Sequence, residues 1–143
     1  MKIKPRKNNS GLSFVAIMII IAIVSLLLRF AIEKIIKINI PKNESSAQGT
    51  LKLISAALEN YAKNNNGAYP LKLSALVQAN PAYLDKDYTV ISAVKGYDYS
   101  CSKLDSMGYN CAASPVKCKI TGRKNYTIST GGLLVAQECS KAE

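Results

Sequence analysis

The chain has 143 residues, 48% of them hydrophobic, and it carries a formal net charge of +10 with no histidine. This length predicts a single domain. The lack of histidine removes the commonest general base and the usual zinc ligand, which argues against hydrolytic triads and most metal sites. We therefore expect a protein that is not an enzyme, with no catalytic residue, no bound metal and no cofactor.

Four of the positive charges lie in the first seven residues, at Lys2, Lys4, Arg6 and Lys7. Without them the chain has 15 basic against nine acidic residues, a net charge of +6. That balance suits contact with anionic lipid headgroups or with nucleic acid, but it requires neither.

An apolar run of 17 residues, Leu12 to Leu28, contains no charge and no proline. As a helix it is about 25 Å long, at the short end for a bilayer core. Arg29 interrupts the run, but Phe30 to Ile32 continue it, and a long arginine side chain can reach the headgroups. We predict a membrane-spanning helix, because only a helix satisfies the backbone of such a segment in lipid.

The charges beside this segment favour a cytoplasmic amino terminus. Both flanks are basic, but a first helix with a basic leader usually sets the orientation and leaves the bulk of the chain outside. A removed secretory signal peptide is the alternative. The apolar run is longer than the core of such signals, and no small-x-small cleavage site follows it.

The helical pattern continues beyond the apolar run. Apolar side chains recur on one face at Ile32, Ile35, Ile36 and Ile40, while the opposite face carries Glu33, Lys34 and Lys37. This spacing predicts a helix to about Asn39. A break or kink is expected at Pro41, because the residue before a proline disfavours the helical conformation.

Two further helices are predicted in the rest of the chain. The first covers Glu44 to Asn64 and ends in an Asn-Asn-Asn-Gly run. Its apolar stripe consists of Leu51, Ile54, Leu58 and Tyr61, widened by Ala57 and Ala62. A short second helix is expected from Leu73 to Gln78, ended by Asn80-Pro81.

After Asp87 the composition changes to Val, Ile, Thr and Tyr, which favours strands. Four strands are predicted: Tyr88 to Val94, Tyr97 to Ser100, Tyr126 to Thr130 and Leu133 to Glu138. The Gly131-Gly132 pair indicates a hairpin between the last two. The expected fold is α+β, with a long amino-terminal transmembrane helix packed on a small antiparallel sheet of three or four strands.

The four cysteines all lie in the last third of the chain, at Cys101, Cys111, Cys118 and Cys139. Outside the cytoplasm an even number of cysteines indicates disulfides. Three connectivities are open from sequence alone. We favour Cys101–Cys111 and Cys118–Cys139, and the spacing is too wide for a typical zinc site.

Several segments follow one another in an order that matches one protein family. A short basic leader ends in Gly11 and is followed by LSFVAIMIIIAIVSLLL and by a long helix with a proline in its middle. Farther on stand LENYAKNNNGAYP, LSAL, YLDKDY, YDYSC and YTISTGG. Over essentially the whole chain this order resembles type IV pilins and the pseudopilins of type II secretion systems. The similarity is greatest to the subgroup in which an N-x-G-x-YP segment links the long helix to the sheet domain.

The resemblance implies a processing site and a division of the chain. In this family a membrane-embedded prepilin peptidase cuts after the leader glycine and methylates the new amino terminus. Gly11 would then end the leader, and Leu12 would begin the mature chain. The implied parts are a leader (1–11), a transmembrane and amphipathic helix (12–40) and a pilin-like periplasmic head (41–143).

One position departs from the family pattern. Ala16 stands where the family has a glutamate, which is thought to pair with the amino-terminal ammonium of a neighbouring subunit. A chain without this glutamate fits a minor subunit near a filament tip better than the abundant repeating subunit. An anchor that is never processed is the alternative.

Two functions remain open at this stage. The resemblance implies a filament subunit of the bacterial inner membrane, whose partners would be other pilin-like subunits and the prepilin peptidase. The alternative is a membrane-tethered binding module with nucleic acid as its partner, for which the basic cluster Lys117, Lys119, Arg123 and Lys124 beside Tyr126 would supply phosphate contacts. A solvated loop is the simpler explanation of this cluster, and we favour it over nucleic-acid contacts. Asp85, Asp87, Asp98 and Asp105 match no calcium-loop spacing, and we interpret them as surface acids.

Overall fold

The computed structural model describes residues 14–140 of the chain. They belong to two compact units, divided between Ile35 and Ile36. The second unit, called the head below, therefore begins a few residues before the expected boundary at 41. Ile40 shows why, because its side chain is only 4% exposed and belongs to the packing of the head.

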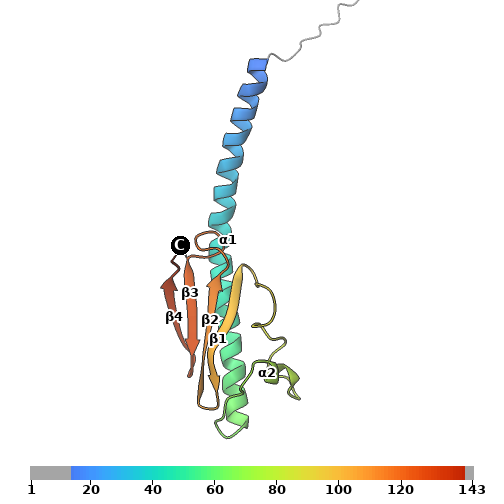
Figure 1. The fold of residues 1–143 in the computed structure, drawn as a ribbon, viewed down its shortest axis with the longest axis vertical. Coiled ribbons are helices and arrows are strands. Elements are labelled where there is room, and N and C mark those ends of the chain that lie inside the picture. The colour runs from blue at the N-terminus through green and yellow to red at the C-terminus, as the bar shows by residue number, and fades with distance from the viewer. Residues whose placement is uncertain (1–13, 141–143) are drawn as a thin grey trace, which may run out of the picture. The chain divides into compact units, whose positions relative to one another are not determined.

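Helix α1 is a single helix of 51 residues, Phe14–Asn64, with Pro41 inside it (Figure 1). The expected break at Pro41 is wrong. A proline inside a helix costs about 3 kcal/mol, because one hydrogen bond is lost and the ring crowds the preceding turn. Here Pro41 and Lys37 are both exposed, so water can satisfy the freed carbonyl, and burial of Ile40 just before the proline helps to hold the chain helical.

The predicted apolar stripe of the helix is confirmed in the part that lies in the head. Its buried residues are Ala47, Leu51, Ile54, Ala57, Leu58 and Ala62, and Tyr61 packs against them. The predicted short helix is also present as α2, Ser74–Gln78, which buries Leu76. The buried residues of α1 recur every three or four positions, so they lie on one side of the helix, which packs against the core.

The sheet has four antiparallel strands in the order β1-β2-β3-β4. Their bounds are β1 Tyr97–Asp105, β2 Gly108–Pro115, β3 Lys124–Ser129 and β4 Leu133–Glu138. The head is thus a sheet packed on the second half of α1, which confirms the α+β layout (Figure 1). Gly131 and Gly132 form the predicted turn before β4, both with positive φ angles that glycine adopts without steric cost.

Two strand predictions need correction. Tyr88 to Val94 is not a strand; Asp87 caps a turn there by accepting hydrogen bonds from the amide and the hydroxyl of Thr89. Val90 is 77% exposed, so β propensity without a pairing partner does not make a strand. Conversely, β2 was not predicted, because GYNCAASP contains no β-branched residue; it is held instead by pairing with β1 on one side and β3 on the other.

Tyrosines fill most of the space between the sheet and α1. Side chains alternate along each strand, and the buried set on the inner face is Tyr97, Tyr99, Tyr109, Cys111, Ala113, Tyr126 and Ile128. Pairs such as Tyr88–Tyr99 and Tyr69–Tyr109 meet edge to face, with ring centroids 5.8 and 5.4 Å apart. This geometry is favourable for aromatic rings and lets a core without tryptophan bury large side chains.

Candidate functional site: an exposed apolar helix and a basic loop

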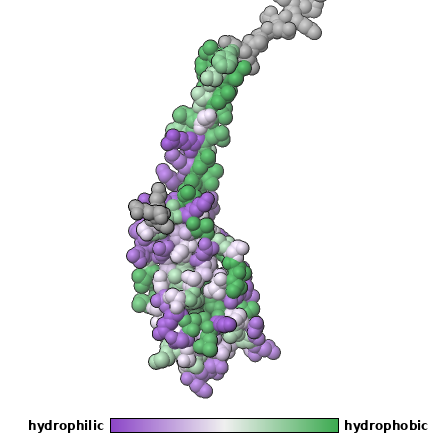
Figure 2. All heavy atoms as spheres, in the orientation of Figure 1, coloured by the Kyte–Doolittle hydropathy of each residue, from purple (hydrophilic) through white to green (hydrophobic). Residues whose placement is uncertain are grey.

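The first unit consists of the part of α1 up to Ile35, and its apolar side chains are exposed. The large ones are Phe14, Val15, Ile17, Met18, Ile19, Ile20, Ile21, Ile23, Val24, Leu26, Leu27, Leu28, Phe30, Ile32 and Ile35. Figure 2 shows them as a green surface along the helix. Within residues 14–140, α1 is the one helix long and apolar enough to cross a membrane. In water this surface would be costly, so it needs an apolar environment.

Three of the polar side chains in this segment have a local partner. The Ser25 hydroxyl donates to the carbonyl of Ile21 at 2.7 Å, and Arg29 lies 3.9 Å from Glu33 one turn later. A hydroxyl bonded to its own helix can enter lipid without an unsatisfied donor. The exposed Arg29–Glu33 pair lies where the apolar run ends, as expected of residues at a membrane surface.

The predicted processing site, Gly11 and Leu12, lies outside the described residues. Ala16 lies within them, in the first turn of α1, and that turn contains no acidic residue. The amino-terminal end of the described helix therefore has no side chain that could pair with a neighbour's ammonium group.

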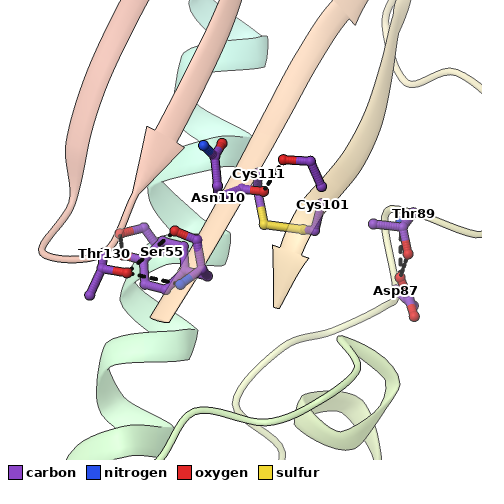
Figure 3. Close-up of a disulfide and its surroundings, with 9 residues drawn as sticks. Ser55, Asp87, Thr89, Cys101, Asn110, Cys111 and Thr130 are labelled. Carbon is purple, nitrogen blue, oxygen red and sulfur yellow. Dashed lines mark hydrogen bonds between the residues drawn. A yellow bond between two sulfur atoms is a disulfide. The ribbon is translucent and has the colours of Figure 1, made fainter. Parts of the chain in front are cut away.

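The structure contains both disulfides of the favoured pairing. Cys101 and Cys111 lie directly opposite each other on β1 and β2, as Figure 3 shows. Cys118 and Cys139 join the loop after β2 to the end of β4. Together they fasten the central hairpin and the carboxy-terminal strand of a small domain.

The four predicted cations all lie in one segment, residues 116–124, which is called the basic loop below. Lys117, Lys119 and Arg123 lie in the turn between β2 and β3, and Lys124 is the first residue of β3; all four are exposed. The loop folds back on itself, because the Lys119 amide donates to the carbonyl of Gly122 at 2.7 Å. Within residues 14–140 the ion pairs are Arg29–Glu33 and Lys103–Asp105, so none of these four cations takes part in one.

The basic loop is attached to α1. The side-chain amide of Asn43 donates to the carbonyl of Thr121 at 2.9 Å, and the Arg123 amide donates to the Glu44 carboxylate at 2.8 Å. Gly122 is buried against Tyr97, where a Cβ atom would overlap the tyrosine hydroxyl. Tyr97 in turn donates to the carbonyl of Lys124 at 2.9 Å. The loop is thus held in one shape by the Cys118–Cys139 disulfide, by α1 and by β1.

A polar cluster around Glu59 was not predicted from the sequence. One carboxylate oxygen of Glu59 accepts from the Tyr109 hydroxyl at 2.9 Å and from the Gly131 amide at 2.8 Å. The other accepts from the Tyr69 hydroxyl at 2.9 Å. Because Tyr109 donates its one proton to Glu59, the Ser55 hydroxyl at 2.7 Å must donate to Tyr109.

The cluster changes the acidity of its members. Partial burial would raise the pKa of Glu59, but the hydrogen bonds donated by Gly131, Tyr109 and Tyr69 outweigh this effect, and its pKa is lowered. Burial, together with the neighbouring Glu59, raises the pKa of Tyr109 to about 12. A charged Glu59 with neutral tyrosine donors is therefore the stable state near neutral pH. In the sequence, the one sign of this cluster is the position of Glu59, an acid next to the apolar stripe and shortly before the NNNGAYP segment.

Three of the four predicted surface acids serve as local hydrogen-bond acceptors, and the fourth, Asp98, is exposed on β1. Asp105 accepts from the amides of Met107 and Gly108 in the β1–β2 turn, and Asp87 caps the turn at Thr89 (Figure 3). Asp85 accepts from the Tyr88 hydroxyl at 3.2 Å. Among the described residues, no group of three or more His, Cys, Asp or Glu side chains could hold a metal ion.

A surface hollow of the head, about 530 Å³ in volume, lies between residues 71–74, residues 87–90 and β1. Its charged side chains are Lys72 and Asp87, and Asp87 already accepts a hydrogen bond from the Thr89 hydroxyl.

No protein-family model, curated protein or solved structure matches the chain.

Proposed function

We propose that the chain is a pilin-like structural subunit, of the pseudopilin kind, in a type IV pilus or a type II secretion filament. One observation carries the proposal. A single helix presents an exposed apolar surface over residues 14–35 and then continues, without interruption at Pro41, into the core of an α+β head. Such a helix is at once a membrane anchor and a surface that other helices of the same kind can cover.

The environment of the anchor follows from its surface. In lipid the exposed apolar side chains carry no cost in solvation free energy, so association between helices depends on close packing. Outside lipid the same side chains require apolar partners, which neighbouring copies of such helices supply. The proposed partners are therefore the inner membrane and other pilin-like subunits.

The location proposed for the head is the periplasm, with the amino terminus in the cytoplasm. Two disulfides in a small domain fit an oxidising compartment. The basic leader fits the same orientation. Because Ala16 provides no acid for a neighbour's amino terminus, the proposed position is that of a minor subunit, at or near a filament tip.

Processing by a prepilin peptidase after Gly11, with methylation of Leu12, is part of the proposal. The mass of the purified protein from cells with and without the peptidase tests it, and the chain should be 11 residues shorter when the enzyme is present. A Gly11→Val variant should keep the full mass in both strains. Identical masses of the unchanged chain in the two strains would contradict processing, but not the anchor.

A second candidate is a membrane-tethered module that binds nucleic acid, favoured by the four exposed cations of the basic loop. Phosphate contacts of this kind weaken steeply as salt is added. Titration of the protein in detergent with duplex DNA at low and high salt tests this function. Absence of binding at low salt rejects it.

A further inference from the structure

Positive charge is gathered at one end of the head. Around the docking point of the basic loop on Asn43 lie six basic residues, Lys42, Lys95, Lys117, Lys119, Arg123 and Lys124, called the basic end below. Lys95 belongs to it because the adjacent Gly96 approaches Thr121 and Asn43. The acids among them are Glu44, already bonded to the Arg123 amide, and Glu138, opposite Lys124 on β4. The rest of residues 36–140 has six basic against five acidic residues.

The basic end also exposes apolar side chains. Val116 is 48% and Ile120 50% exposed, although both belong to a loop that is closed by a disulfide and docked on α1. Cations next to exposed aliphatic side chains are the composition that partitions into the headgroup layer of a membrane. Tyr126, the aromatic residue beside the cluster, is only 3% exposed, so it offers no ring on which a base could stack.

The docking point of the basic loop lies close in the sequence to the proposed membrane-spanning segment. A hydrocarbon core of about 30 Å takes about 20 residues of helix, and the headgroup layer takes about four more. Counted from Phe14, the first described residue of α1, these 24 or so residues extend to about Lys37. Asn43 follows six residues later, a chain distance of about 9 Å in a helix, comparable with the Debye length of about 8–10 Å at physiological salt.

We propose that the basic end binds the anionic headgroups of the membrane that holds α1. The inference rests on the anchor of the proposed function and adds a second, electrostatic contact to it. Each lysine or arginine near an anionic surface shifts the contact equilibrium about fivefold. Because the anchor tethers the head to the bilayer through a short stretch of chain, contact of the loop with the headgroups is intramolecular, which raises their effective concentration.

The test uses the full chain reconstituted into vesicles of phosphatidylcholine alone, or of phosphatidylcholine with phosphatidylglycerol. A benzophenone amino acid replaces Ile120 to record lipid contact by photo-crosslinking. The matched control replaces Met107, which is 85% exposed in the turn at the far end of β1. Lipid adducts should form at position 120 in anionic vesicles, and they should drop severalfold without phosphatidylglycerol, in high salt, or at position 107.

Charge variants separate the basic end from overall charge. The quadruple change Lys117→Gln, Lys119→Gln, Arg123→Gln and Lys124→Gln should reduce the adducts at position 120 at least fivefold. The same change at four exposed lysines elsewhere, Lys52, Lys63, Lys72 and Lys86, should leave them unchanged.

The outcomes are distinguishable. A chain that does not float with either kind of vesicle overturns the anchor, and this inference with it. A chain that floats but gives equal adducts at positions 120 and 107, or equal adducts in both vesicles, overturns the inference alone. Duplex DNA that removes the adducts in anionic vesicles would identify nucleic acid as the preferred ligand and would also overturn it.

Discussion

At the scale of single residues, Glu59 holds three segments together, two of which are distant from it in the sequence. Its carboxylate accepts hydrogen bonds from β2, from the β3–β4 turn and from the segment after α1. Hydrogen bonds to a charged acceptor are stronger than neutral ones, and a buried donor that loses its acceptor is costly. Glu59 therefore links the end of α1 to the sheet.

The first prediction is that acid destabilises the head through Glu59. Because its pKa is lower in the folded than in the unfolded chain, folding releases protons, and the stabilisation is present above the unfolded pKa of about 4.3. It is lost as the pH falls through the folded value. Glu59→Gln should lower the free energy of unfolding by about 1 kcal/mol at pH 7. When the pH is lowered from 5 to 3, the free energy of unfolding should decrease less in this variant than in the unchanged chain.

Urea unfolding of the full chain in detergent, followed by circular dichroism between pH 3 and 7, measures this effect. Asp98→Asn, at an exposed position of β1, is the control and should keep the pH dependence of the unchanged chain. An unaltered pH profile in Glu59→Gln would show that the carboxylate is not the acid-sensitive group.

The second prediction concerns two glycines with opposite roles. Gly122→Ala should destabilise the head by about 1–3 kcal/mol, because the new Cβ would overlap Tyr97 and displace the basic loop. Gly49→Ala, in the exposed middle of α1 with nothing within 4 Å, should stabilise by about 0.5–1 kcal/mol. Thermal unfolding decides the signs; two shifts in the same direction would refute the close approach at Gly122.

At the scale of elements, the two disulfides connect different parts of the head. Cys101–Cys111 joins neighbours that are already paired in a hairpin, across a sequence separation of 10. Cys118–Cys139 has a separation of 21 and holds both the basic loop and the end of β4. The second bridge closes the longer loop of the unfolded chain, and no strand pairing replaces it at Cys118.

The third prediction is that Cys118→Ala with Cys139→Ala costs about 3 kcal/mol and raises amide hydrogen exchange in residues 116–124. Cys101→Ala with Cys111→Ala should lower the stability as well, but without loosening the basic loop. Mass-spectrometric hydrogen exchange on both double variants distinguishes the two effects. Equal exchange of residues 116–124 in the two variants would contradict the role given to the second bridge.

At the scale of the whole molecule, the two units differ in what they need from their surroundings. In the described part of the first unit, residues 14–35, no residue belongs to the hydrophobic core, and the large apolar side chains are exposed. The head has its own core, built from α1 and the sheet, and both disulfides. The head is therefore expected to keep its fold when the first unit is removed, while the full chain requires lipid or apolar partners.

The fourth prediction follows from that difference. A chain that begins at Ile36, exported behind a cleavable signal peptide, should be found in the soluble periplasmic fraction, with both disulfides formed and a cooperative unfolding transition. The full chain should remain with the membrane after a high-salt wash, because its attachment is mainly apolar. Cell fractionation and mass mapping of the cysteine pairs check both; a full chain released by salt would contradict the anchor.

The sequence alone determined the features that depend on local patterns. The apolar run after Leu12, the stripe from Leu51 to Leu58 and the Gly131-Gly132 turn each have a spacing or composition that one kind of structure satisfies best. Most of the fold could be predicted in this way. The favoured cysteine pairs are those of the structure, although the sequence had left two other connectivities open.

Only the tertiary structure decided the features in which distant contacts outweigh local preference. β2 is a strand because β1 and β3 pair with it, whereas Tyr88 to Val94 has the propensity of a strand but pairs only through an isolated bridge between Val94 and Tyr97. Pro41 stays inside α1, in a helix held on one side by the buried Ile40. The bond between Glu59 and Gly131 and the docking of the basic loop on Asn43 join residues 72 and 78 positions apart, a relation that no local pattern contains.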